Sequence, residues 1–166
     1  MGFITNDKEA YLFMKDHLLN QMEKSMDKLN ECTYRGYSQN ILDQLNDEAK
    51  TIAEQNGLYD EEDEEDVYND LLASHSPNLK CAVGALIIDE FYSQNLEGRT
   101  VCTTEMDIVE AVQKSNPIWK ITGSSITLMK AFQNIHDSYE PSVWEYRIDK
   151  LKDNFNDYND FSGASQ

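Results

Sequence analysis

The sequence predicts a mainly α-helical domain with at most one small β-hairpin, so the fold class is mainly α or, at most, α+β. Apolar side chains recur at three- and four-residue steps in several separate segments, which is the pattern of amphipathic helices. The most continuous apolar stretch, residues 79–88, is much shorter than a membrane span. The chain has 166 residues, which is the size of one domain.

The first half of the chain begins with a helix predicted over residues 7–31. Its apolar side chains share helical spacing: Tyr11, Met14, Leu18, Met22, Met26 and Leu29. Asn6 and Glu9 supply a capping box for its first turn. Residues 33–35 are expected to be extended and to pair with residues 79–81. A second helix is predicted over residues 39–56, because Asn56-Gly57 is a helix stop signal. One face of this helix is predicted to be buried, with Ile41, Leu45, Ala49 and Ile52.

The middle of the chain starts with residues 58–70, an acidic tract with little apolar content. Residues 67–73 favour a short helix, and Ser76-Pro77-Asn78 favours a turn. After an extended start at residues 79–81, a helix is expected over residues 82–92, followed by a loop over residues 93–99.

Three helices are predicted for the last third of the chain. The first begins at Thr104 and ends before Pro117. The second follows Gly123-Ser124-Ser125 and carries Leu128, Phe132 and Ile135 on one face. The third begins at Pro141 and repeats Trp144, Ile148, Leu151 and Phe155. Residues 156–166 are polar, and we expect a disordered tail there.

Composition restricts the classes of partner. The formal net charge is −17, which disfavours direct binding to nucleic acids or to anionic membranes. The first six residues lack the basic and apolar regions of a signal peptide. The cysteines Cys32, Cys81 and Cys102 are odd in number and lack paired spacing, so a cytoplasmic protein is expected.

The acidic residues are concentrated between residues 43 and 70. This stretch holds twelve carboxylates and a single base, Lys50. One interpretation is a solvated loop that aids solubility, and another is a docking surface for a basic partner. Calcium binding is a third interpretation with less support, because the alternating ligands and central glycine of an EF-hand are missing. The predicted partner-binding residues are Asp60, Glu61, Glu62, Asp63, Glu64, Glu65, Asp66 and Asp70.

Several short motifs occur in a characteristic order. They are Tyr34-Arg35-Gly36, the run LKCAVGALI at 79–87, Asp89-Glu90-Phe91-Tyr92, Leu96-Glu97-Gly98, Phe132-Gln133-Asn134-Ile135-His136-Asp137 and Trp144. This order resembles a family of small uncharacterised proteins of tailed bacteriophages and some bacterial genomes. The family has no established activity, so the resemblance implies a phage-type origin and no particular reaction.

The chain departs from this family between Gly36 and Leu79. It has 42 residues there, whereas relatives have a short turn. We therefore expect a single domain, residues 1–166, with an acidic insertion at residues 37–78. A hairpin tip accepts an insertion at modest cost in loop-closure entropy. The resemblance also places Ile88 where relatives often carry proline.

Two groups of residues were considered for chemistry. Cys81, His136 and Asp89 or Asp137 have the residue types of a nucleophilic set, although the apolar surroundings of Cys81 favour an inert thiol. The alternative for His136 is a structural role at a helix C-terminus, where a histidine interacts favourably with the helix dipole. The carboxylates Asp89, Glu90 and Glu97 could act in acid–base or metal chemistry, or form a helix-end charge cluster.

Tyr34, Arg35 and Lys80 form a candidate anion-binding corner. The rival interpretation is a structural salt bridge from Arg35 to Asp89, Glu90 or Glu97. No phosphate-loop, dinucleotide, zinc or nucleophile-elbow motif is present, so neither a cofactor nor a metal is expected and an enzyme is disfavoured.

Two functional hypotheses follow. In the first, a phage-encoded cytoplasmic protein inhibits or modulates a basic host protein that handles nucleic acid or acts in antiviral defence, by occlusion or by imitating phosphates. In the second, a small enzyme or ligand-binding protein uses the region of Arg35, Cys81, Asp89, Glu97 and His136.

Overall fold

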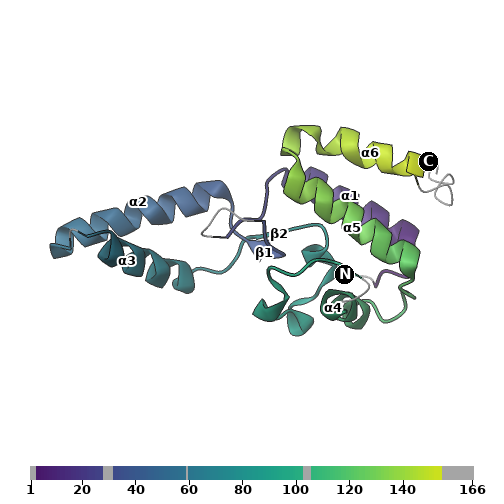
Figure 1. Cartoon of the computed structure of the whole chain (residues 1–166), viewed down its shortest axis with the longest axis horizontal. Helices are drawn as coiled ribbons and strands as arrows, with labels where there is room; N and C mark the ends of the chain where they lie inside the picture. The colour runs from purple at the N-terminus through teal and green to yellow at the C-terminus, as the bar shows by residue number, and fades with distance from the viewer. Residues whose placement is uncertain (1–2, 28–31, 59, 103–105, 155–166) are drawn as a thin grey trace.

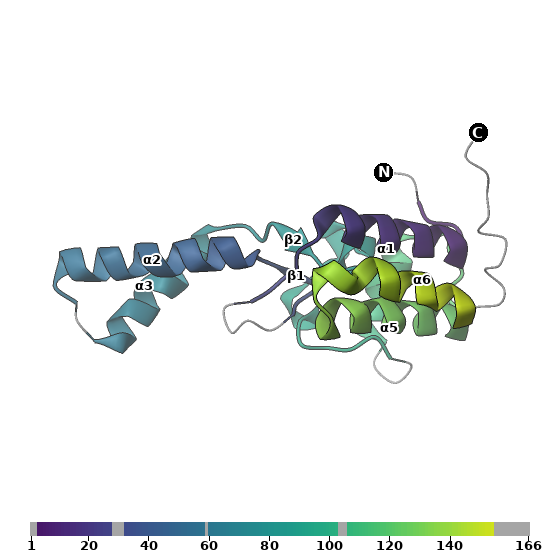
Figure 2. The same ribbon diagram turned by 90° about the horizontal axis from the view of Figure 1, so that it is seen from above.

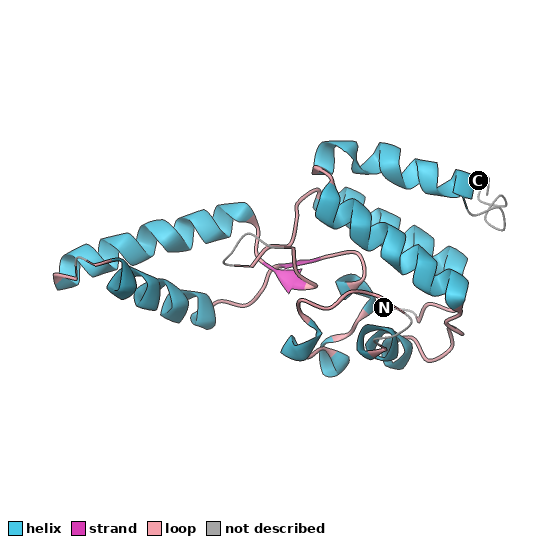
Figure 3. Ribbon diagram, viewed as in Figure 1, coloured by secondary structure: helices cyan, strands magenta, loops and turns pink. Residues whose placement is uncertain are grey.

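The computed structural model describes residues 3–27, 32–58, 60–102 and 106–154, and this part of the chain is mainly helical. It contains six α-helices, several short 3-10 turns and one pair of two-residue strands (Figure 3). The predicted fold class is therefore confirmed. None of the described helices is both long enough and apolar enough to cross a bilayer.

The body of the molecule is built on three helices that pack against one another (Figure 1). They are α1 (Asp7–Gln21), α5 (Gly123–Ser138) and α6 (Trp144–Asn154). A fourth helix, α4 (Asp107–Ser115), packs against a short 3-10 turn. The largest fully buried side chains of the body include Trp119, Trp144, Tyr11 and Phe132. The rings of Tyr11 and Phe132 meet edge to face, with their centroids 5.4 Å apart.

Helix α1 begins as predicted but ends ten residues earlier than the apolar spacing indicated. The Asn6 side chain accepts a hydrogen bond from the Glu9 amide, while the Glu9 carboxylate accepts from the Thr5 amide at 2.8 Å. Met22 then adopts a left-handed conformation, with φ of 51°, and closes the helix. After this turn, Met26 forms isolated antiparallel β-bridges with Cys32 and Tyr37. This backbone pairing overrides the helical pattern of the sequence. Residues 28–31 of the predicted helix lie outside the described part.

The predicted β-hairpin is present. Strand β1 (Arg35–Gly36) pairs antiparallel with β2 (Leu79–Lys80), with Arg35 opposite Lys80 and Gly36 opposite Leu79. The Cys81 amide extends the pairing by donating to the Tyr34 carbonyl at 3.1 Å. These strands lie where the insertion leaves the body (Figure 1).

The helix predicted over residues 82–92 is wrong, whereas the loop predicted over 93–99 is present and includes one short 3-10 turn. The chain instead forms three successive 3-10 turns: η1 (Gly84–Leu86), η2 (Asp89–Phe91) and η3 (Gln94–Leu96). Gly84 explains the first of them, because a side chain there would collide with the backbone carbonyl of Tyr34. This close approach of two backbones bends the chain around β1 instead of letting a helix continue.

The insertion forms a second helical unit. Helix α2 (Gln39–Asn56) has the predicted bounds and ends at Gly57, whose φ of 72° suits a residue without a side chain. Its buried face is rotated slightly from the predicted one, because Leu42, Leu45, Ala49 and Ala53 are buried while Ile41 and Ile52 are half-buried.

The acidic tract is helical rather than a loop. Helix α3 (Glu61–Ser74) begins six residues before the predicted short helix and packs against α2. Asp60 explains the early start, because its side chain accepts a hydrogen bond from the Asp63 amide at 2.9 Å. The two helices project from the body (Figure 2). The main core cluster includes no residue of α2 or α3, so these helices share a small apolar seam of their own.

The last three helices agree with the sequence. Helix α4 buries Ile108 and Val112, and α5 buries Leu128, Phe132 and Ile135. Pro141–Val143 forms a 3-10 turn, η4, before α6. Thr104, Phe155 and the expected tail at residues 156–166 lie outside the described residues.

Gly84→Ala is expected to destabilise the body, because the new methyl group would have to displace the Tyr34 backbone. Overpacking of this kind costs about 1–3 kcal/mol. Gly123→Ala is the matched control, since nothing lies within 4 Å of the added Cβ. It should be neutral or stabilise by about 0.4–1 kcal/mol. Urea unfolding of both variants measures the difference, and equal midpoints would contradict the close approach.

Candidate functional site

The projecting pair of helices is the main candidate site, and we call residues 39–58 and 60–74 the acidic hairpin. Exposed carboxylates lie on both helices: Asp43, Asp47, Glu48 and Glu54 on α2, and Glu61, Glu62, Glu65, Asp66 and Asp70 on α3. Asp63 and Glu64 are half-buried. Helix α3 has no fully buried residue, so most of its surface faces solvent.

The start of α3 concentrates negative charge. Its first turn consists of Glu61, Glu62, Asp63 and Glu64, and the positive end of the helix dipole favours acids there. Partial desolvation, followed by the neighbouring carboxylates of Asp60, Asp66 and Glu62, raises the pKa of Asp63. This shift indicates that the carboxylates of this turn repel one another.

Several of the described lysines and arginines form ion pairs in the body. Ion pairs of the described lysines and arginines join Lys15 to Asp149, Lys24 to Glu140, Arg35 and Lys80 to Asp89, Arg99 to Asp107, and Lys114 to Glu110. On the acidic hairpin, Lys50 lines a hollow of about 190 Å³ between the two helices, together with Glu61, Glu64 and Glu65. One lysine leaves a large excess of negative charge on this unit.

The base of the acidic hairpin is held by hydrogen bonds. The Tyr37 amide donates to the Met26 carbonyl at 2.8 Å, and the Tyr37 hydroxyl donates to the His75 carbonyl at 3.0 Å. The Ser38 amide donates to the Asn78 side chain at 3.1 Å. These contacts tie the two ends of the insertion to each other and to the segment after α1.

At the candidate anion-binding corner, Arg35 and Lys80 bind the carboxylate of the chain's own Asp89. Asp89 accepts from Arg35 at 2.8 Å and from Lys80 at 3.2 Å, so the predicted structural salt bridge is present. Lys80 and then Arg35 lower the pKa of Asp89. The Arg35 guanidinium also stacks 3.9 Å from the centre of the Tyr92 ring.

Glu97 completes this corner as a structural acceptor. Its carboxylate accepts from the amides of Tyr34 at 2.8 Å and Arg35 at 3.1 Å. It also accepts from the Tyr92 hydroxyl at 2.6 Å. The structure thus brings Arg35, Lys80, Asp89 and Glu97 together, but it uses their polar atoms to hold β1 against the turns that follow β2.

Cys81, His136 and Asp89 each have different partners. The buried Cys81 sulfur accepts from the Gly84 amide at 3.2 Å, and burial raises the pKa of its thiol strongly. Asp89 lies in the ion pairs described above. His136 is fully buried near the end of α5 and is hydrogen-bonded to Ser25 and Asp137. Of the predicted nucleophilic set, the structure joins His136 to Asp137. Asp89 lies in its own ion pairs and the Cys81 thiol is buried, which gives little support to a shared nucleophilic site.

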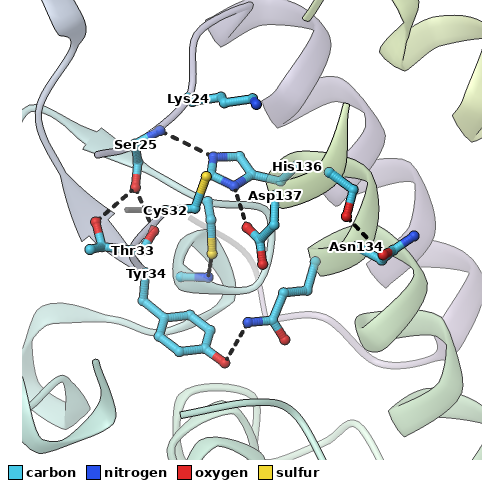
Figure 4. Close-up of polar contacts among 12 residues, drawn as sticks. Lys24, Ser25, Cys32, Thr33, Tyr34, Asn134, His136 and Asp137 are labelled. Atoms are coloured by element: carbon cyan, nitrogen blue, oxygen red, sulfur yellow. Dashed lines mark hydrogen bonds and ion pairs between the residues drawn. The ribbon is translucent and has the colours of Figure 1, made fainter. Parts of the chain in front are cut away.

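The predicted pair His136 and Asp137 is joined by Cys32, which the sequence did not place there (Figure 4). One ligand atom each from Cys32, His136 and Asp137 lies within 4.8 Å of the others. The Ser25 amide donates to His136 Nε2 at 3.1 Å, so in the neutral ring Nδ1 carries the proton and donates to Asp137 at 2.9 Å. A metal at Nδ1 would move that proton to Nε2, against the Ser25 amide. These hydrogen bonds favour a structural role over metal binding.

One local signal of this cluster is visible in the sequence, the adjacent pair His136-Asp137. Cys32 comes from a distant segment, so no ligand spacing was available to connect it. A separate cleft of about 480 Å³ lies between η2, η3 and α4, and its charged lining includes the Arg99–Asp107 ion pair. Of the candidate residues named from the sequence, Glu90 lines this cleft.

Comparisons with known proteins found no matching family model, no matching curated protein and no matching solved structure. The function is therefore argued from the geometry of this chain.

The cysteines offer a direct test of the nucleophile hypothesis. Burial raises the pKa of Cys32 to about 11, with Asp137 adding to the shift, and raises that of Cys81 further. We expect both thiols to react slowly with iodoacetamide at pH 8 in the folded protein and rapidly in urea. Mass spectrometry of the labelled peptides measures the rates. Fast labelling of Cys81 in the folded protein would instead support the hypothesis that Cys81 is a nucleophile.

The body should fold without the acidic hairpin. Deleting residues 38–77 would join Tyr37 to Asn78, leaving a two-residue turn between the paired Gly36 and Leu79. Because the main core uses no residue of α2 or α3, we expect cooperative thermal unfolding to persist in circular dichroism. Loss of the cooperative transition would show that the body depends on the insertion.

Proposed function

We propose that this protein is a binding protein of phage type that docks onto a basic protein of a bacterial host through its acidic hairpin. The observation that carries the proposal is the position of the charge: exposed carboxylates crowd a projecting helical pair in which Lys50 is the only lysine or arginine. Complementary charge speeds encounter and selects a positive partner surface.

The arrangement of acids on α3 supports this proposal because it carries a stability cost. Glu61 and Glu65, and likewise Glu62 and Asp66, are four residues apart on one helix. Like charges at this spacing destabilise a helix by about 0.2–0.5 kcal/mol per pair. A cationic partner would relieve the repulsion between these pairs of carboxylates.

The mechanism follows from the shape of the acidic hairpin. Successive carboxylates in these rows are four residues, or about 6 Å along the helix axis, apart. A regular row of negative charges can occupy a groove that binds a phosphate backbone. The bound hairpin would then occlude that groove, so the partner class is a host protein that handles nucleic acid, including antiviral defence factors, met in the host cytoplasm.

The second hypothesis, a small enzyme or ligand-binding protein, has less support. Arg35, Asp89 and Glu97 are engaged with one another or with backbone groups, and Cys81 is buried. Arg35→Ala would nevertheless test it, because loss of a measured activity without loss of folding would favour this alternative.

Neutralising three exposed acids tests the proposal. Glu61→Gln, Glu62→Gln and Asp66→Asn remove charge from the acidic hairpin, while Asp16→Asn, Glu90→Gln and Glu145→Gln remove the same charge from exposed sites on the body. At about 0.5 kcal/mol per exposed pair, the hairpin triple should weaken partner binding roughly tenfold.

The measurement is a pull-down from host lysate, followed by titration of the purified partner at rising salt. The body triple should retain the partner, and affinity should fall as salt rises. Equal effects of the two triples would mean that net charge, not the acidic hairpin, governs binding.

A further inference from the structure

A groove at the base of the acidic hairpin has the character of a docking surface. It encloses about 510 Å³ between the end of α1, the first turn of α2 and the connection from α5 to α6. Its apolar lining includes Met22, Met26 and Pro141. The Met22 side chain is 44% exposed, which is high for a large apolar residue. Flexible methionines adapt to different apolar partners and are common on binding surfaces.

The position of Met22 results from the way α1 ends. The left-handed turn at φ of 51° is rare for a residue with a side chain. It stops the helix before Met22 and Met26 can join the core stripe that holds Met14 and Leu18. Two of the apolar side chains that the sequence assigned to one helix face therefore line an open groove instead.

The charge around the groove selects the sign of the occupant. Lys24 pairs with Glu140 at 3.5 Å, and Glu23 lines the same groove, so the charged lining residues sum to minus one. Gln39, which lines the groove, donates a hydrogen bond of 2.9 Å to Asp43 on α2. The groove thus opens onto the negative surface of the acidic hairpin.

The end of α3 is tied to the same region. Tyr37 donates its amide to the carbonyl of Met26, a residue that lines the groove, at 2.8 Å, and its hydroxyl to the carbonyl of His75, directly after α3, at 3.0 Å. The base of the acidic hairpin therefore adjoins the groove.

We propose that this groove takes an apolar anchor from an amphipathic, positively charged helix of the partner, whose basic side chains lie along the acidic hairpin. The inference rests on the proposed function and adds a requirement to it: charge alone is insufficient, and the partner must carry apolar side chains beside its lysines or arginines. The groove volume is in the range of sites that bury a few large side chains.

The test uses two synthetic peptides as probes. One is an amphipathic leucine–lysine helix, and the other has the same number of lysines with serine in place of leucine. The full-length protein is labelled with ¹³C at its methionine methyl groups. Met106 provides a matched reference, because it is 42% exposed and does not line the groove.

We expect the leucine–lysine peptide to shift the Met22 and Met26 signals and leave Met106 unchanged. Met22→Asn keeps a residue type that tolerates the left-handed conformation, and it should weaken this peptide about tenfold. Met106→Asn should change its affinity less than about twofold. The lysine–serine peptide should bind more weakly and be insensitive to Met22→Asn.

The outcomes separate the two proposals. Equal affinity for both peptides, without a shift of the Met22 signal, would overturn the proposal that the groove takes an apolar anchor. Electrostatic docking on the acidic hairpin would remain supported. Binding that is unaffected by the hairpin triple Glu61→Gln, Glu62→Gln and Asp66→Asn would overturn the proposed function itself.

Discussion

The close approach of two backbone segments beside the small β-hairpin organises the molecule. The Tyr34 carbonyl accepts from the Cys81 amide at 3.1 Å, and Gly84 packs against the same carbonyl because it has no side chain. The Glu97 carboxylate secures the other side by accepting from the amides of Tyr34 and Arg35. The insertion leaves on one side of this junction, and the core of the body lies on the other (Figure 1).

This junction separates two kinds of surface chemistry. In the body, several described cations are paired with carboxylates, as in Arg35–Asp89 and Arg99–Asp107. The acidic hairpin has its own apolar seam and one lysine among many acids, so its charge is not balanced by the rest of the chain. A unit that shares no residue with the main core can change its surface without changing the packing of the body.

The residue types that suggest catalysis serve the fold instead. Arg35 and Glu97 hold β1, and His136 links the end of α5 to the Ser25 amide. Cys81 is buried against the Gly84 amide. Buried polar groups need hydrogen-bond partners, so a small helical domain with an irregular central segment uses such side chains to satisfy its backbone. This is why chemical residue types alone were a weak guide to a site.

Local signals in the sequence determined the fold class, the bounds of α2, the start of α1 and the concentration of acids, because caps, stop signals and apolar spacing act within a few residues. The acidic tract showed the limit of apolar patterning, since Asp60 and the helix dipole support α3 where apolar side chains are few.

Only the tertiary structure decided where α1 ends, why residues 84–96 form 3-10 turns, and that Cys32 meets His136 and Asp137. Each depends on contacts between segments far apart in the chain: Met26 with Tyr37, and Gly84 with Tyr34. Such contacts override local preference because burial and backbone pairing outweigh the few tenths of a kcal/mol that separate one residue's conformations.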